Sequence, residues 1–257
     1  MIIMNANVTG VLAKILEPIG YSNLISPKAE RSTVLSNWAL DNGRFIVFKK
    51  ALKGIKIEWN EEEWIDMLLW SMHLEPLRKV AYPATKPQWG IVPDVVGDSK
   101  ATIEEFHRYK DIFKAIGLPM AYAVQNGAVP KDVPKEASVI FVGGTRDWKW
   151  ETAEMWCKEF PRVHIGGVNS LQGFILAEKY GAESVDGSAM TKNHKQKMDL
   201  VSFLTKEYLN EGLFGEHPDF KKEIYREAIA HIYRKDKKQY TKRKKKLVKE
   251  SCKGILY

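Results

Sequence analysis

The sequence lacks several features that would place it in a specialised class of protein. It contains only two cysteines, Cys157 and Cys252, in 257 residues, too few for a disulfide framework or a four-ligand zinc site. No uninterrupted apolar stretch approaches the ~18 residues of a membrane-spanning helix. Residues 1–10 also lack the basic flank of a secretory signal. We therefore expect a cytoplasmic protein, in a reducing compartment, that uses neither a membrane nor a structural metal.

Nucleotide-binding fingerprints are missing as well. Neither G-x-G-x-x-G nor G-x-x-x-x-G-K-[ST] occurs in the chain, so we expect no nucleotide cofactor. The composition is 44% hydrophobic and 28% charged, which is ordinary globular usage and excludes a disordered or fibrous chain. The length fits one α/β barrel, which commonly has about 250 residues, or two small domains.

Positive charge is concentrated near the C-terminus. Residues 221–250 contain thirteen Lys or Arg and four acidic residues, so this segment has a net charge of +9. The whole chain has a net charge of +8, so the rest of it carries −1. Such a segment is typical of contact with phosphate backbones, although a solvated helix would have the same composition. We predict that DNA is bound by the run Lys242, Arg243, Lys244, Lys245 and Lys246.

From residue 89 onward, short apolar runs alternate with amphipathic segments. Strands are expected at 89–94, 120–125, 138–143, 162–166 and 183–186, and helices at 99–116, at 170–180 and from a cap at Asp147 to 160. This alternation indicates a parallel sheet covered on both faces. We predict a TIM-like (β/α)8 barrel over residues 1–205 and a basic helical C-terminal extension over 206–257. Residues 1–88 have a less regular pattern, in which we expect a strand at 34–40 followed by a tight turn at 41–45, and an acidic-start helix at 61–73.

Polar residues follow the expected strands. Asp41, Asp94 and Asp186 each come at a strand end, and Gln125 ends another strand. A single aspartate there is usually a helix cap or turn residue, as we expect for Asp98. Three carboxylates on separate strands of one barrel would converge on a single mouth, where they could divide into nucleophile and general acid/base.

Two glycine pairs also lie at strand ends. Gly143-Gly144 and Gly166-Gly167 would allow a ligand to approach the backbone closely, and the second pair precedes a helix N-terminus, which favours anions. His164 lies within an expected strand, where we interpret it as a core residue.

Six motifs, in order between residues 36 and 190, resemble the tRNA-guanine transglycosylase superfamily, and its branch of DpdA-type 7-deazaguanine DNA transglycosylases in particular. They are LDNG (40–43), VPDVVGD (92–98), VQNG (124–127), FVGGT (141–145), HIGGVNS (164–170) and GAESVDG (181–187). The resemblance implies an enzyme, a pentosyltransferase, that exchanges guanine in DNA for a 7-deazaguanine (preQ0-like) base through a covalent aspartyl-deoxyribose intermediate.

The resemblance also implies a role for each matching residue. Asp186 corresponds to the nucleophile and Asp41 to the general acid/base. Asp94 and Gln125 correspond to residues that hold the heterocyclic base, beside the backbone of Gly143 and Gly144. DNA, guanine and the 7-deazaguanine base are then the partners.

The chain departs from the tRNA-acting enzymes in two ways. It lacks their C-x-C-x-x-C…H zinc site, and a lysine-rich tail replaces their longer C-terminus. Gly167 also stands where DNA-acting relatives carry an arginine. Three alternatives stay open at this point: a tRNA-guanine transglycosylase, a phosphate-binding sugar isomerase barrel, and a non-catalytic nucleic-acid-binding barrel.

Overall fold

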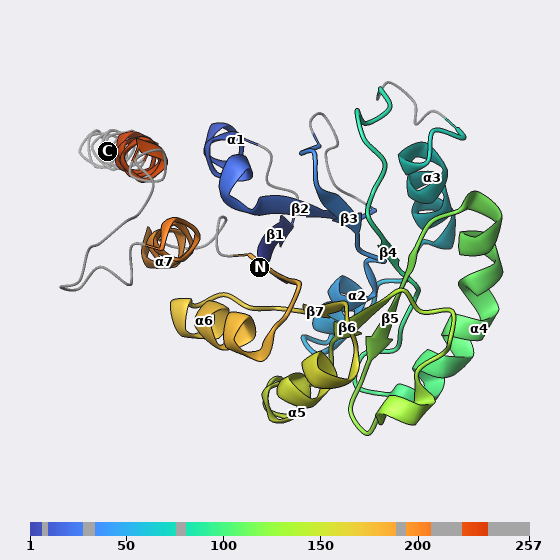
Figure 1. Ribbon diagram of the computed structural model, residues 1–257. Helices are drawn as coiled ribbons and strands as arrows, with labels where there is room; N and C mark the ends of the chain where they lie inside the picture. The colour runs from blue at the N-terminus through green and yellow to red at the C-terminus, as the bar shows by residue number, and fades with distance from the viewer. Residues whose placement is uncertain (7–9, 28–33, 76–80, 189–193, 207–222, 236–257) are drawn as a thin grey trace, which may run out of the picture.

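The chain folds as a closed barrel of eight parallel strands in a computed structural model (Figure 1). The structure describes residues 1–6, 10–27, 34–75, 81–188, 194–206 and 223–235. Each strand pairs with the next, and the eighth closes on the first, with Met4 opposite Asp186. The strands are β1 (Ile2–Ala6), β2 (Tyr21–Ile25), β3 (Trp38–Leu40), β4 (Gly90–Ile91), β5 (Met120–Val124), β6 (Val139–Val142), β7 (Val163–Ile165) and β8 (Ser184–Gly187).

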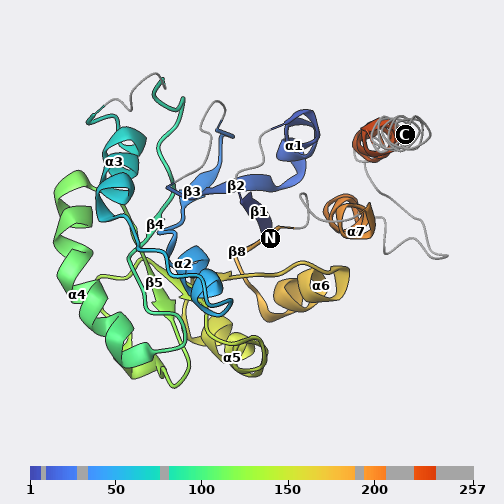
Figure 2. The ribbon, with the colours of Figure 1, turned by 180° about the vertical axis from the view of Figure 1, so that it is seen from behind.

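Helices surround the strands (Figures 1 and 2). They are α1 (Val11–Leu16), α2 (Arg44–Ala51), α3 (Glu61–Ser71), α4 (Ser99–Ile116), α5 (Arg146–Glu159), α6 (Leu171–Tyr180) and α7 (His194–Thr205), with 3-10 turns at Glu17–Ile19 and Pro130–Asp132. Helix α4 shows how the sequence sets these elements. Asp98 caps its first turn by accepting from the Ala101 N–H at 3.0 Å, and Gly117 ends it at a φ of +69°, a conformation that glycine adopts readily.

Two separate apolar cores stabilise the barrel. The interior of the barrel is filled by side chains from the strands and by Trp89, which precedes β4. A larger core lies between the strands and the surrounding helices. The inner core consists of Met4, Leu24, Ala39, Trp89, Ile91, Ala121, Ala123 and Val139. Such packing makes the barrel a solid scaffold, so ligands can reach only its ends.

The predicted (β/α)8 class is confirmed, with differences in detail. The irregular first 88 residues contain two strands and two helices that the sequence pattern did not predict: β1, β2, α1 and α2. The cap expected at Asp147 is wrong. Thr145 occupies the N-cap position and Asp147 lies in the first turn, where a carboxylate is favoured by the helix dipole without capping it.

Residues 223–235 form a further helix, within the predicted extension. Ala228 and Ile232 of this helix are buried in the larger core, so this part of the extension packs onto the barrel. Lys242 to Lys246 lie outside the described residues. Among the helices that the structure describes, none has the length and apolar character needed to cross a bilayer.

Candidate active site

Asp41, Asp94 and Asp186 come together at the C-terminal end of the barrel. Asp41 directly follows β3, Asp94 lies three residues beyond β4, and Asp186 lies within β8. The charges of Asp94 and Asp186 both act on the Asp41 carboxyl and raise its pKa, as expected only for groups close to one another. The convergence of these three carboxylates is what the sequence predicted from their positions at strand ends.

Asp186 is held by two donors. Its Oδ1 accepts from His164 Nε2 at 3.1 Å and from the Gly167 backbone N–H at 3.0 Å. The side chain remains 17% exposed, so the carboxylate is oriented by the protein while it keeps contact with the mouth. A fixed carboxylate that stays accessible is suited to nucleophilic attack.

His164 was interpreted from the sequence as a core residue, and its burial agrees with that. The ring packs against Phe141, with centroids 4.9 Å apart, and edge-on to Trp89 at 5.1 Å. Its contact with Asp186 was missed. A proton on Nε2 lets the ring donate to Asp186, and the Ser184 hydroxyl lies 2.8 Å from Nδ1 on the other side of the ring.

Lys149 is a second residue that sequence reasoning missed. It belongs to α5, yet its side chain is buried and its Nζ donates to the Gly166 carbonyl. Burial lowers the pKa of Lys149, and the nearby charge of Asp186 acts in the opposite direction. A lysine is rarely buried unless it is paired, so this position is a marker of a functional site.

The Asp41 carboxyl has a strongly shifted pKa. Burial, together with the charges of Asp186 and Asp94, raises it to about 7, although the Gly43 N–H, 3.2 Å from Oδ1, favours the ionised form. Gly43 has a φ of +78° and forms the N-cap of α2, so the chain turns sharply beside this carboxyl. A group with a pKa near neutrality can both give and take a proton.

Asp94 is nearly buried and has an amide on each side. Its Oδ1 accepts from Asn42 Nδ2 at 2.8 Å and its Oδ2 from Gln125 Nε2 at 2.6 Å. Burial raises the pKa of Asp94, and these two hydrogen bonds and the charge of Arg44 counteract that effect. Each carboxylate oxygen keeps a lone pair for a further donor.

Gln125 connects Asp94 to the first glycine pair. Its Oε1 accepts from the backbone N–H of Gly97 at 2.9 Å and of Gly144 at 2.8 Å. Gly144 has a φ of +72°, and a Cβ there would lie 2.6 Å from the ring of Trp148, so only glycine fits. Gln125, Gly143 and Gly144 are thus adjacent, as the resemblance implies.

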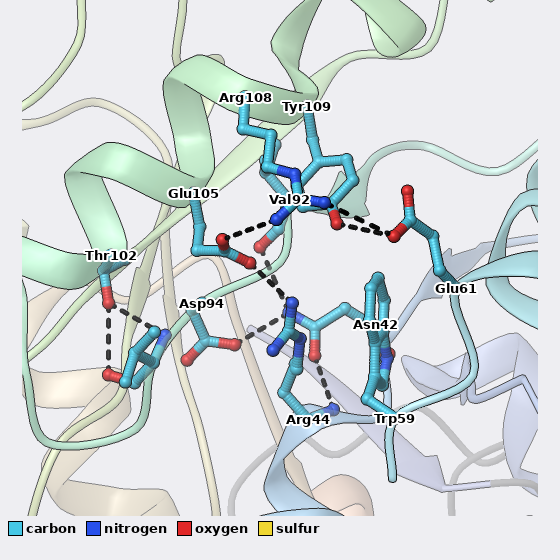
Figure 3. Close-up of polar contacts among 11 residues, drawn as sticks. Asn42, Arg44, Trp59, Glu61, Val92, Asp94, Thr102, Glu105, Arg108 and Tyr109 are labelled. Atoms are coloured by element: carbon cyan, nitrogen blue, oxygen red, sulfur yellow. Dashed lines mark hydrogen bonds and ion pairs between the residues drawn. The ribbon is translucent and has the colours of Figure 1, made fainter.

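Arg44 closes the far side of the Asp94 region (Figure 3). Its guanidinium stacks on the Trp59 ring, 3.9 Å from the centroid, and its Nη2 lies 2.5 Å from Glu105 Oε2. Trp59 in turn donates to the Asn42 carbonyl at 2.8 Å. This arrangement fixes the loop that carries Asn42, and it follows from long-range packing that no local sequence signal reveals.

The backbone donors at the second glycine pair are already used. The Gly166 N–H donates to the Val142 carbonyl at 3.1 Å, and the Gly167 N–H donates to Asp186 Oδ1 at 3.0 Å. The sequence had suggested a close approach of a ligand to this backbone. The geometry instead uses it to orient the carboxylate of β8.

The described site therefore combines one accessible carboxylate, a neighbouring acid/base group and a buried carboxylate flanked by amides. Comparison of the chain with models of protein families and with characterised proteins gives no match to either.

Proposed function

We propose that the protein is a DNA-guanine transglycosylase, which replaces guanine in DNA by a 7-deazaguanine base through a covalent intermediate on Asp186. The observation that carries the proposal is the convergence of Asp186 with Asp41, whose carboxyl has a pKa of about 7. Two carboxyl groups in different environments, Asp186 held by two hydrogen-bond donors and Asp41 with its pKa raised toward neutrality, suit displacement at a sugar carbon with a covalent intermediate.

In the first step the Asp186 carboxylate attacks C1′ of the deoxyribose. The C1′–N9 bond breaks, its electron pair goes to guanine, and guanine takes a proton from Asp41. In the second step the incoming base loses its N9 proton to the Asp41 carboxylate, and its N9 displaces Asp186 from C1′. Asp41 is thus returned to its protonated form, and no oxidant or cofactor is consumed.

In this proposal Asp94 and Gln125 bind the base. Guanine presents N–H donors at N1 and at its exocyclic amine, and an acceptor at O6. The free lone pairs of Asp94 would accept the former. Gln125 Nε2 has two hydrogens, one of them bonded to Asp94, and the other would donate to O6. Guanine and a 7-deazaguanine share this edge, so one pocket serves both bases.

Two of the alternatives lose support at this site. A phosphate-binding isomerase would need free backbone N–H groups at the second glycine pair, and those of Gly166 and Gly167 are bonded within the protein. A non-catalytic barrel would have no reason to keep Asp94 and Lys149 buried, and Asp41 beside them with a raised pKa, because burial of such groups is costly. The tRNA alternative shares the same chemistry and must be tested directly.

The test is incorporation of radiolabelled guanine into duplex DNA, single-stranded DNA or tRNA, with the D186A protein as control. Label in DNA that requires Asp186 supports the proposal. Label in tRNA alone would support a tRNA-guanine transglycosylase instead. No label in any polymer, together with no release of labelled guanine from DNA when a 7-deazaguanine is supplied, would contradict transglycosylation altogether.

A further inference from the structure

Helix α2 and the segment after it expose an unusual amount of apolar surface. No residue of α2 is fully buried, and the exposed fractions reach 53% for Phe45, 37% for Phe48 and 72% for Leu52. Ile46, Ile55 and Ile57 are exposed as well. We call residues 45–57 the α2 surface. Contiguous exposed apolar residues of this kind mark an interaction site.

The α2 surface is also strongly basic. Residues 44–57 contain five cations and no acidic residue. Four of these cations are exposed, and none of the four forms an ion pair within the part of the chain that the structure describes. They are Lys49, Lys50, Lys53 and Lys56. The surface therefore fits a polyanion.

Cations and aromatic rings share the same side of the helix. Lys49 Nζ lies 5.6 Å from the centroid of the Phe45 ring, and the Phe45 and Phe48 rings are nearly parallel with centroids 6.4 Å apart. A helix lying on a membrane keeps its charges and its apolar side chains on opposite faces. Interleaved rings and ammonium groups instead match a chain whose phosphates and bases alternate.

The location of the surface connects it with the candidate active site. Helix α2 begins three residues after Asp41. In Figure 2 it lies in front of the strands and inside the ring of the other helices, over the C-terminal end of the barrel. A strand bound here would pass beside the three carboxylates.

We propose that the α2 surface binds unpaired nucleotides that flank the target base, with Phe45 and Phe48 stacking on bases and the four lysines contacting phosphates. The inference rests on the proposed function for the identity of the polyanion. A base must leave the duplex to reach a barrel mouth, so its neighbours lose their own stacking partners. Two exposed rings beside the mouth replace that stacking, and each stacked base strengthens binding by about fivefold or more.

A second copy of the chain fits this surface poorly. In a two-fold contact the same patch meets itself, and here four lysines would face four lysines with no acidic residue in the patch. Such a contact is opposed by like-charge repulsion.

The experiment measures the affinity of the full-length protein for a fluorescent single-stranded DNA across a salt series. F45L/F48L keeps apolar side chains but removes the rings, and we expect it to weaken binding at least tenfold. Replacement of the four lysines by Gln should flatten the slope of log affinity against log salt by up to about three, because each phosphate contact on a single strand contributes about −0.7. The matched control replaces four exposed lysines elsewhere by Gln: Lys14, Lys135, Lys158 and Lys179.

All variants are also made with Lys242, Arg243, Lys244, Lys245 and Lys246 changed to Gln, so that binding by that run cannot mask the α2 surface. Affinities equal to that of the parent protein, or equal losses in the control, would overturn the inference. Two further results would also overturn it. One is binding of the protein to phosphatidylserine vesicles that persists in F45L/F48L, and the other is a dimer, seen by sedimentation, that dissociates in F45L/F48L. If DNA binding depends on the Phe45 and Phe48 rings but no base exchange occurs, the proposed function is refuted and the α2 surface is still supported as a binding site. Base exchange by F45L/F48L at unchanged affinity would refute only the surface.

Discussion

Lys149 and Asp186 contact opposite ends of the same peptide unit. The Lys149 Nζ donates to the Gly166 carbonyl, and the N–H of the next residue, Gly167, donates to Asp186 Oδ1. A donor at the carbonyl oxygen polarises the peptide and strengthens its N–H as a donor. The peptide thus couples a helix residue outside the barrel to the carboxylate at its mouth.

We therefore expect K149M to slow exchange by about ten- to hundredfold, because the peptide that orients Asp186 loses its anchor. The effect should fall on kcat, with the KM for the base little changed, and K149R should restore part of the rate. Steady-state kinetics of the three proteins measure this. A loss confined to KM, or a loss that tracks the thermal midpoint of unfolding, would mean that Lys149 serves only the fold.

D186A should abolish exchange and leave the barrel folded, because the side chain is partly exposed and contributes little to the core. In the wild type, denaturation during turnover should trap a protein–DNA adduct, visible as a shifted band on a denaturing gel. D186A should give no such band. Near-wild-type turnover by this variant would make the assignment of the nucleophile wrong.

Asp41 should control the pH dependence of the first half-reaction. With its pKa raised to about 7, the protonated fraction that guanine departure requires falls as the pH rises through 7. We expect kcat/KM for DNA to decline above pH 7 in the wild type. D41N should lower the rate about 10²- to 10⁴-fold and remove this decline. An unchanged pH profile in D41N would exclude Asp41 as the acid.

Asp94 should determine the affinity for the base. D94A removes the acceptor for the N–H groups of guanine and leaves Asn42 and Gln125 without their shared partner. A site of this kind loses up to about 10⁴-fold in affinity when such hydrogen bonds are missing. Competition assays should show that guanine and a 7-deazaguanine weaken together in D94A. Equal affinities in D94A and the wild type would assign Asp94 a purely structural role.

The basic run outside the described residues should govern binding to duplex DNA. Residues 221–250 carry +9 on a body of −1, and each phosphate contact on a duplex contributes about −0.9 to the salt slope. Replacing Lys242, Arg243, Lys244, Lys245 and Lys246 by Gln should flatten that slope by a few units, and the affinity should fall for all DNA sequences alike. A salt titration of both proteins measures it, and identical slopes would indicate a solubilising segment.

The sequence predicted the barrel from its regular second half, where helices such as α4 have clear caps and an apolar face. It did not reveal β1 and β2, whose buried asparagines Asn5 and Asn23 interrupt the apolar runs. Strand identity at these places is set by pairing with neighbours, which a local pattern does not contain.

The carboxylates could be predicted because strand ends share one edge, whereas their partners could not. Ser184 and Asp186 are two positions apart on β8, and His164 lies opposite Ser184 on β7, so this period-two polar pattern was the available signal for His164. Lys149 gave no such signal. Its place near Asp186 depends on how α5 packs, and helix packing is not encoded in any short motif.

Under the proposed function, the nucleophile lies on the strand whose pairing with β1 closes the barrel. A chain released before residue 184 would have Asp41, Asp94 and Lys149 but no nucleophile, and its β1 and β7 would be open edges that invite aggregation. Asp186 arrives on the strand that closes both edges. Under the proposed function, closure of the barrel and completion of the carboxylate site are therefore one event.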